Sequence, residues 1–125
     1  MEAERGSSGL DTTLAYVYGA ACAAACDDDA AQRTTERVFD AMYDGSVARD
    51  VLAARAVRLA VRADPSPAFA AMDVPAREAV ALTRLLKWDV DKVAAELAID
   101  RNDVKALLND GLHAIRNQLQ PVTAA

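Results

Sequence analysis

The residue types that most often carry enzyme chemistry are few in this sequence, and their spacing does not suit catalysis. His113 is the only histidine, and it lies late in a predicted helix with no evident nucleophile or acid as a partner. The carboxylates are scattered or fall at expected helix starts, and no glycine-rich phosphate loop is present. A catalytic site needs two or three reactive groups placed together. We therefore predict a protein that is not an enzyme, with no catalytic residue and no cofactor.

The two cysteines, Cys22 and Cys26, lie one helical turn apart. Two thiolates at this spacing could face one metal ion, but structural zinc needs about four ligands and a single histidine supplies too few partners. Small cysteines are also common in buried cores. The sequence therefore predicts core residues rather than a metal site, in a reduced, cytoplasmic setting.

Three arginines are the best candidates for binding an anionic group. Arg55, Arg58 and Arg62 are spaced so that one helix presents them in a narrow stripe. The guanidinium head group binds carboxylates and phosphates through several donors at once. The simpler interpretation is that they form the solvated edge of a mostly buried helix. The functional interpretation is a contact with a polyanion or with an acidic partner.

Helices must position all of these residues, because the composition leaves little room for strands. The chain has 125 residues, of which 53% are hydrophobic and only 5% aromatic, with five glycines and four prolines. Much of the hydrophobic content is alanine, which favours closely packed helices. The net charge of −5 argues against holding DNA by bulk electrostatics, although a local basic face remains compatible with it. The predicted fold class is all-α.

Capping residues and hydrophobic periodicity divide the chain into two small helical bundles. The two prolines of the segment 64–67 indicate an extended linker between them. Before the linker we predict helices at 11–26, 29–44 and 46–63, and after it a helix beginning at Pro75, a short helix ending near 98 and a longer one from 100 to 118. The predicted organisation is a flexible N-terminus (1–10), a helical domain (11–63), a linker (64–72), a helix-turn-helix domain (73–119) and a flexible C-terminus (120–125).

Several residues should fix the geometry of the second half. Asp89 and Asp100 are expected as N-caps of its last two helices, and Glu78 in the first turn of the helix that begins at Pro75. Trp88 is expected to pack over the bundle. The inner face of the last helix is predicted from its apolar spacing and comprises Val104, Leu107 or Leu108, Leu112 and Ile115.

The apolar segment 14–26 is too short for a membrane span, which needs about 20 residues. The segment before it carries Glu2 and Glu4 against Arg5, instead of the positive cluster typical of a signal peptide. We expect a soluble, cytoplasmic protein without a membrane contact.

Three segments of the second half resemble region 4 of the sigma-70 family, and most closely its extracytoplasmic-function (ECF) group. They read VPAREAVAL (74–82), VAAELAID (93–100) and VKALLNDGLHAIR (104–116). Residues 15–45 resemble region 2 of this family, with Val38 and Phe39 in the place of its Val-Phe pair, and residues 52–62 resemble the helix that follows. The similarity covers most of the chain.

The resemblance implies two sets of contact residues. Region 4 of the family inserts its second helix-turn-helix helix into the major groove of the promoter, which would make Arg101, Asn102, Lys105 and Arg116 the DNA-binding residues. Region 2 docks on core RNA polymerase. The implied partner is therefore this polymerase or an anti-sigma factor, and the partner-binding residues would be Val38, Phe39, Met42 and Tyr43, joined by Arg55, Arg58 and Arg62.

The sequence departs from the family in its charges and in one loop. The segment from Lys92 to Arg116 contains four basic and four acidic residues, so it has no surplus positive charge with which to bind phosphates. Asp103 and Asp110 replace a threonine and an arginine of the family pattern, while Arg33 and Arg37 stand at positions that are usually acidic. The eleven residues between Tyr43 and Arg55 are fewer than in the family and lack its promoter-melting aromatic residues.

These departures predict a degenerate sigma-like regulator of transcription initiation. It would act mainly through protein contacts, with an anti-sigma factor, RNA polymerase or a second copy as a homodimer, and would bind promoter DNA weakly. One alternative is an authentic minimal ECF sigma factor that binds core polymerase and promoter DNA. Another is a helical interaction module with no role in transcription, because helix-turn-helix periodicity alone is a weak signal.

Overall fold

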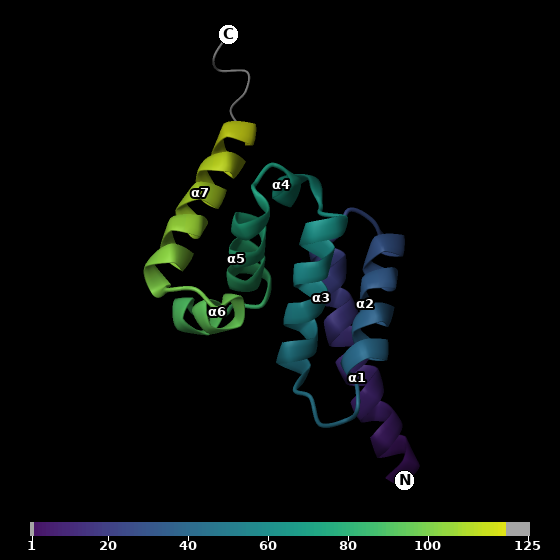
Figure 1. The fold of residues 1–125 in the computed structure, drawn as a ribbon. Coiled ribbons are helices and arrows are strands. Elements are labelled where there is room, and N and C mark those ends of the chain that lie inside the picture. Colours follow the sequence, from purple (N-terminus) through teal and green to yellow (C-terminus); the bar gives the residue numbers. More distant parts are fainter. Residues whose placement is uncertain (1, 120–125) are drawn as a thin grey trace.

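The structure, a computed structural model, describes the backbone of residues 2–119 and the side chains of residues 12–117. Over this range the chain forms helices and no sheet, which confirms the all-α prediction (Figure 1). An isolated bridge between Ala25 and Pro65 is the one extended pairing in the described part. The helices are α1 (Glu2–Ala24), α2 (Asp28–Met42), α3 (Arg49–Ala63), α4 (Pro67–Ala70), α5 (Val74–Leu85), α6 (Val90–Leu97) and α7 (Arg101–Leu119).

The first helix begins earlier and ends earlier than the sequence predicts. The expected flexible segment 1–10 is helical from Glu2 onward, because no proline interrupts it and adding residues to an existing helix costs little. At the other end, α1 stops at Ala24. Asp27 then starts α2 by accepting a hydrogen bond from the backbone N–H of Ala30 at 2.8 Å. The predicted flexible segment 120–125 lies outside the described residues.

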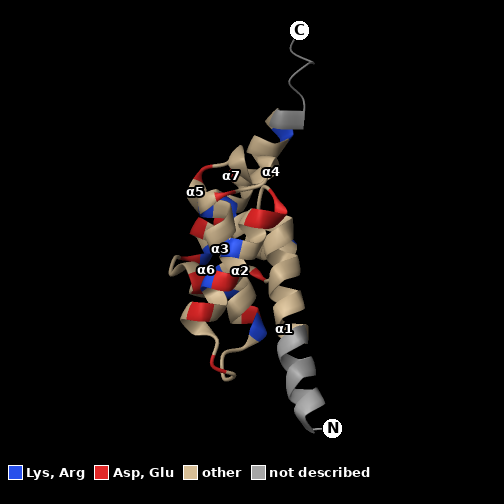
Figure 2. Cartoon of the chain, turned by 90° about the vertical axis from the view of Figure 1, so that its right-hand side faces the viewer, with Lys and Arg blue, Asp and Glu red and all other residues tan. Residues whose placement is uncertain are grey.

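Helices α1, α2 and α3 pack side by side around a core rich in alanine (Figure 1). Val17, Val38, Leu52, Val57 and Val61 are its largest fully buried side chains. Small alanines between them allow the helices to approach closely. The described part of α1 carries no charged residue from Thr12 to Ala24, and Figure 2 shows it as a continuous uncharged rod beside the charged α2 and α3.

The connection between the halves, residues 64–73, is more ordered than the predicted linker. The backbone N–H of Ser66 donates to the carbonyl of Ala24 at 2.9 Å, which ties the linker to the end of α1. The expectation of an extended linker is wrong from Pro67 onward, because Pro67 begins α4. Proline is tolerated at the first helical position because the N–H that it lacks would be unpaired there.

Helix α5 begins at Val74, so Pro75 is its second residue rather than its first. Its Arg77 donates to the carbonyl oxygens of Val61 at 3.0 Å and of Met72 at 2.8 Å, and so holds the end of α3 against the start of α5. Buried residues form two clusters that both include parts of α3 and α5. The halves are therefore packed together, and their division into two independent bundles stays a prediction. No helix in the described part is both long enough and apolar enough to cross a membrane.

Candidate functional site

Helices α6 and α7 meet at a three-residue turn, residues 98–100, which gives the short helix, turn and longer helix that the sequence predicts. Asp89 caps α6 as expected, accepting a hydrogen bond from the backbone N–H of Lys92 at 2.8 Å. Ala98 ends α6 with a left-handed backbone (φ 58°, ψ 45°). Such a conformation costs about 1 kcal/mol or more for a residue with a Cβ, so the surrounding packing must hold this turn.

A compact core of buried residues supports the turn between α6 and α7. Ala94 and Val104 are buried in one cluster with Leu82 of α5, and Ile99 packs partly against it. Trp88 belongs to the same cluster with only 8% of its surface exposed, which confirms that it packs over the bundle. The ammonium of Lys92 lies 4.3 Å from the centre of its ring. Trp88 is thus not free to stack on a nucleic-acid base.

The four predicted DNA-binding residues all lie on α7 with exposed side chains. Arg101, Asn102 and Lys105 lie close to its first turn, and Arg116 is about three turns beyond Lys105. Arg101 forms an ion pair with Asp91 of α6 at 3.0 Å, between two well-exposed side chains. An exposed pair of this kind contributes little free energy, so it would break readily for a better partner.

Acidic side chains lie on a different part of the exposed surface of α7. Asp103 lies beside Asn102 in the first turn, and Asp110 is also exposed. The carboxylate of Asp103 suits a helix N-terminus, but Asp110, in the middle of α7, has no such role. At about 100° per residue, Asp103 and Asp110 lie more than 100° around the axis of α7 from Lys105 and Arg116, and Asp110 borders a crevice beside the start of α5.

The inner face of α7 differs from the prediction at one position. Leu112 is 42% exposed, and Gly111 is buried in its place, one heptad after Val104. A Cβ at Gly111 would lie 2.5 Å from Cγ2 of Val80 and 3.1 Å from the sulfur of Met72. Glycine is therefore what allows α7 to approach α5 this closely. Apolar spacing misses this position because glycine carries no hydrophobic side chain.

The predicted partner-binding residues of α2 divide between core and surface. Val38 is 2% exposed and belongs to the core, so it offers very little surface to a partner. Met42 and Phe39 are half-buried, and Tyr43 is 37% exposed. The rings of Phe39 and Tyr43 stack with their centres 5.2 Å apart. The accessible part of this predicted contact is the aromatic pair.

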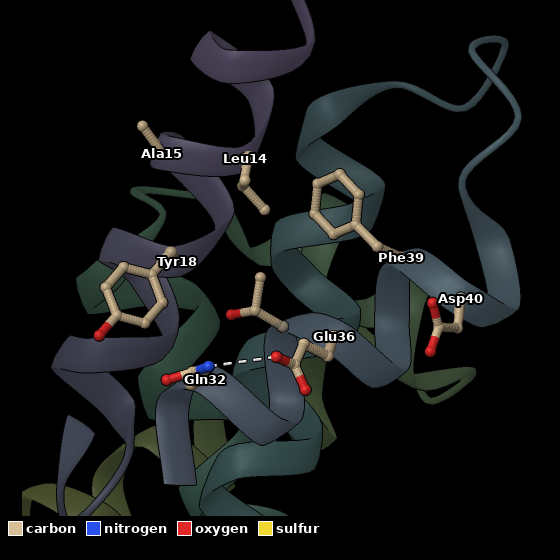
Figure 3. Close-up of a pocket in the computed structure, with 8 residues that line it drawn as sticks. Leu14, Ala15, Tyr18, Gln32, Glu36, Phe39 and Asp40 are labelled. Carbon is tan, nitrogen blue, oxygen red and sulfur yellow. Dashed lines mark hydrogen bonds between the residues drawn. The ribbon is translucent and has the colours of Figure 1, made fainter. Parts of the chain in front are cut away.

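Phe39 also borders a groove between α1 and α2 with a volume of 620 Å³ (Figure 3). Its apolar walls come from Leu14 and Ala15 on one side and Phe39 on the other, and Leu14 is 43% exposed. Figure 3 shows Glu36 and Asp40 along the α2 side of the groove, where the side-chain amide of Gln32 donates to Glu36 at 3.2 Å. The groove thus has apolar walls, and the carboxylates of Glu36 and Asp40 form an acidic rim along its α2 side.

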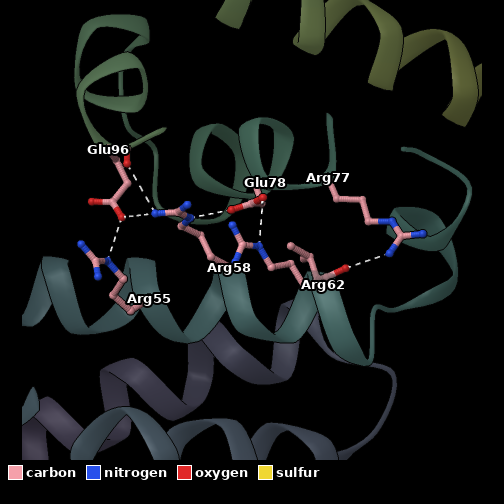
Figure 4. A network of polar contacts seen from close by, with 7 residues as sticks. Arg55, Arg58, Arg62, Arg77, Glu78 and Glu96 are labelled. Carbon is pink, nitrogen blue, oxygen red and sulfur yellow. Dashed lines mark hydrogen bonds and ion pairs between the residues drawn. The ribbon is translucent and has the colours of Figure 1, made fainter. Parts of the chain in front are cut away.

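The arginine stripe of α3 meets carboxylates of the other half of the chain (Figure 4). Arg58 donates through Nε to Glu78 of α5 at 2.5 Å and through Nη1 to Glu96 of α6 at 2.6 Å. Arg62 pairs with Glu78 at 3.1 Å and Arg55 with Glu96 at 2.9 Å. The acidic partner that the stripe suggests is supplied, at least in part, by the chain itself.

Burial makes this network stronger than an ordinary surface pair. The side chains of Arg58, Glu78 and Glu96 are 19%, 7% and 11% exposed. Burial by itself would lower the pKa of Arg58, but the hydrogen bonds with Glu78 and Glu96 outweigh it and raise that pKa. Each buried charge depends on the others for its solvation, so loss of one member should be costly.

Glu78 and Glu96 are the site residues that the sequence-based prediction misses. Glu78 was expected in the first turn of α5, where its negative charge would interact favourably with the helix dipole. It is instead the fifth residue of that helix, and its carboxylate pairs with Arg58 of α3. Glu96 lies in the last turn of α6, where a carboxylate is unfavourable for the helix dipole. That unfavourable position is the one signal in the sequence that could have indicated a cationic neighbour.

The two cysteines differ from the prediction of buried core residues. Cys22 is half-buried, and Cys26 is exposed beyond the end of α1; both are free thiols. Desolvation, followed by the carboxylates of Asp27 and Asp64, raises the pKa of Cys26. A raised pKa disfavours the thiolate that reacts or binds a metal. In the described part of the chain no three side chains of His, Cys, Asp or Glu gather around a common point that could hold a metal ion, and His113 lies exposed on α7.

Comparison with known proteins adds no relative to this description: no family model, no curated protein and no solved structure matches the chain.

Proposed function

We propose that this chain is a degenerate sigma-like regulator of transcription initiation that acts mainly through protein contacts and binds DNA weakly. The observation that carries the proposal is the α6–turn–α7 unit, whose exposed second helix bears the carboxylates of Asp103 and Asp110 as well as three basic side chains, Arg101, Lys105 and Arg116. Its shape suits a major groove, but its charge does not favour phosphates. The sequence resemblance to regions 2 and 4 supplies the link to transcription.

Duplex DNA binding should therefore be weak and only mildly dependent on salt. If Arg101, Lys105 and Arg116 each neutralise one phosphate, log K should fall with log salt with a slope no steeper than about −3. Fluorescence anisotropy with a labelled duplex, measured from low to moderate salt, gives this slope. The double variant Asp103→Asn, Asp110→Asn should bind more tightly, because it removes two negative charges from the helix that carries Arg101, Lys105 and Arg116.

Tight binding with a much steeper slope would contradict this proposal and favour the alternative, an authentic minimal ECF sigma factor. Promoter-dependent transcripts from core polymerase supplemented with this chain would do the same. The exposed positions of Arg101, Asn102, Lys105 and Arg116 are the observation that keeps this alternative open.

The protein contact that we propose is made by the groove between α1 and α2. Its apolar walls, which include Leu14 and Phe39, would bury one face of an amphipathic helix. The rim carboxylates of Glu36 and Asp40 would attract basic residues along the edge of that helix. The proposed occupant is thus a helix with Lys or Arg beside its apolar stripe, presented by an anti-sigma factor or by core polymerase.

Reversing a rim charge tests this contact without disturbing the core. Asp40 is exposed, so Asp40→Lys should leave the fold intact but weaken capture of purified core polymerase or anti-sigma factor by roughly tenfold, about 1.4 kcal/mol. Surface plasmon resonance on the purified pair measures this change. Asp73→Lys is the matched control, since Asp73 is exposed next to α5, outside the groove, and makes no side-chain cap bond.

Equal binding by the two variants would remove the groove from the proposal. Absence of both polymerase and anti-sigma factor, after affinity purification from the native cell and with the purified proteins, would favour the second alternative, a helical interaction module outside transcription.

A further inference from the structure

A second crevice, between α2 and α3, is lined by four arginines and no carboxylate. Arg37 contributes from α2, and Arg55, Arg58 and Arg62 contribute from α3. Val38, Ala41, Met42 and Leu59 complete its walls. Arg55, Arg58 and Arg62 direct their head groups toward Glu78 and Glu96 (Figure 4), so the positive charge at the crevice is offset from one side.

The carboxylates that offset part of this charge come from other helices. Glu78 lies on α5 and Glu96 on α6, and neither lines the crevice. Four arginines against two glutamates leave a surplus of two positive charges. The arginine stripe of α3 thus has carboxylates from α5 and α6 beside it, while none of the residues that line the crevice is acidic.

Several donors of these arginines are unused. Arg55 and Arg62 form their ion pairs only through Nε, which leaves the Nη groups of both without a carboxylate, and their side chains are 48% and 50% exposed. None of the ion pairs among the described residues includes Arg37. Planar guanidinium forks of this kind match the oxygens of phosphate groups.

The size of the crevice restricts its occupant. Its volume is 260 Å³, below the about 300–1,000 Å³ of sites that enclose whole drug-sized ligands. A pyrophosphate group offers several acceptor oxygens and more than one negative charge in a compact form. We propose that this arginine crevice binds the pyrophosphate group of a small phosphorylated ligand, a binding site separate from both the α1–α2 groove and the helix-turn-helix surface.

Isothermal titration of the purified full chain with inorganic pyrophosphate, and in parallel with ADP, tests this site. We expect saturable binding with a dissociation constant on the order of 0.1–1 mM at moderate salt, weakened about tenfold by Arg37→Gln. ADP binding tighter than pyrophosphate would identify a nucleotide as the source of the group. Equal binding of pyrophosphate and ADP would identify the free anion as the source of the group. Both results support the site.

Arg33→Gln is the matched control. Arg33 lies on the same helix and gives the same change in net charge, but it does not line the crevice, and its pair with Asp64 is exposed. We expect this variant to bind within about twofold of the unaltered chain. Arg62→Gln, checked for folding by circular dichroism, provides a second crevice variant. No saturable binding of either probe, or an equal loss in Arg33→Gln and Arg37→Gln, would overturn the proposal, whatever the outcome for polymerase or anti-sigma binding.

Discussion

Replacing Glu78 with alanine should lower the free energy of unfolding by about 3 kcal/mol, because it leaves Arg58 partly buried with only Glu96 as a partner. Arg62 loses its carboxylate in the same variant, although its exposed head group can turn to water. Urea denaturation followed by the fluorescence of Trp88, the single and buried tryptophan, measures the change. Since Trp88 packs among α3 and α5–α7, its signal reports on the contact that the network stabilises.

A second ion pair between the same halves provides the control. Lys92 of α6 pairs with Asp50 of α3 at 3.0 Å, but these side chains are 46% and 45% exposed. Asp50→Ala should therefore cost less than about 1 kcal/mol. A double-mutant cycle with Arg58→Ala and Glu78→Ala should show strong non-additivity. Equal, small losses for Glu78→Ala and Asp50→Ala would mean that the buried network does not hold the halves together.

Replacing Gly111 with alanine should destabilise the protein by up to about 2 kcal/mol, although alanine is the better helix former. The new Cβ would meet Cγ2 of Val80 at 2.5 Å, and Val80 is buried and stiff at its branched carbon. Overpacking of a filled core costs about 1–3 kcal/mol, which exceeds the about 1 kcal/mol gained in helix propensity. Thermal and urea unfolding measure the net effect. Relief of the clash would also move α7 away from α5 and so weaken any contact that needs the present helix-turn-helix geometry.

Gly19 provides the opposite case in the same protein. It lies exposed in the middle of α1, and no atom lies within 4 Å of a Cβ placed there. Gly19→Ala should therefore stabilise the protein by about 0.5–1 kcal/mol. Stabilisation by both substitutions would show that α5 and α7 are packed less closely than in this structure.

Much of the helical organisation could be predicted from the sequence, because the signals involved are local. Asp27 falls in the predicted turn and Asp89 was predicted as a cap, and both accept the N-cap hydrogen bonds that begin α2 and α6. The same kind of signal placed the turn between α6 and α7 to within about one residue. The least accurate boundary was the start of α1, where a polar, glycine-containing segment is helical even though its composition indicates a frayed end.

The candidate site could be predicted only in part. Exposure of Arg101, Asn102, Lys105 and Arg116 follows from the helical period, and the structure agrees. Val38 was misplaced as a contact residue, because a family position does not say how deeply a side chain is buried in this chain. The arginine stripe of α3 was recognised as a place for anions, but its partners were not, since Glu78 and Glu96 are 16 to 41 residues away from the arginines that they bind.

Interactions within one or two helical turns were therefore enough to specify the helices, their caps and their exposed charges. The packing of α3 against α5 and α6 brought Glu78 and Glu96 to the arginine stripe, and the close approach of α5 and α7 required Gly111. These relations depend on distances between residues remote in the chain. No local pattern encodes such distances, because they are set by the free energy of the whole packed core.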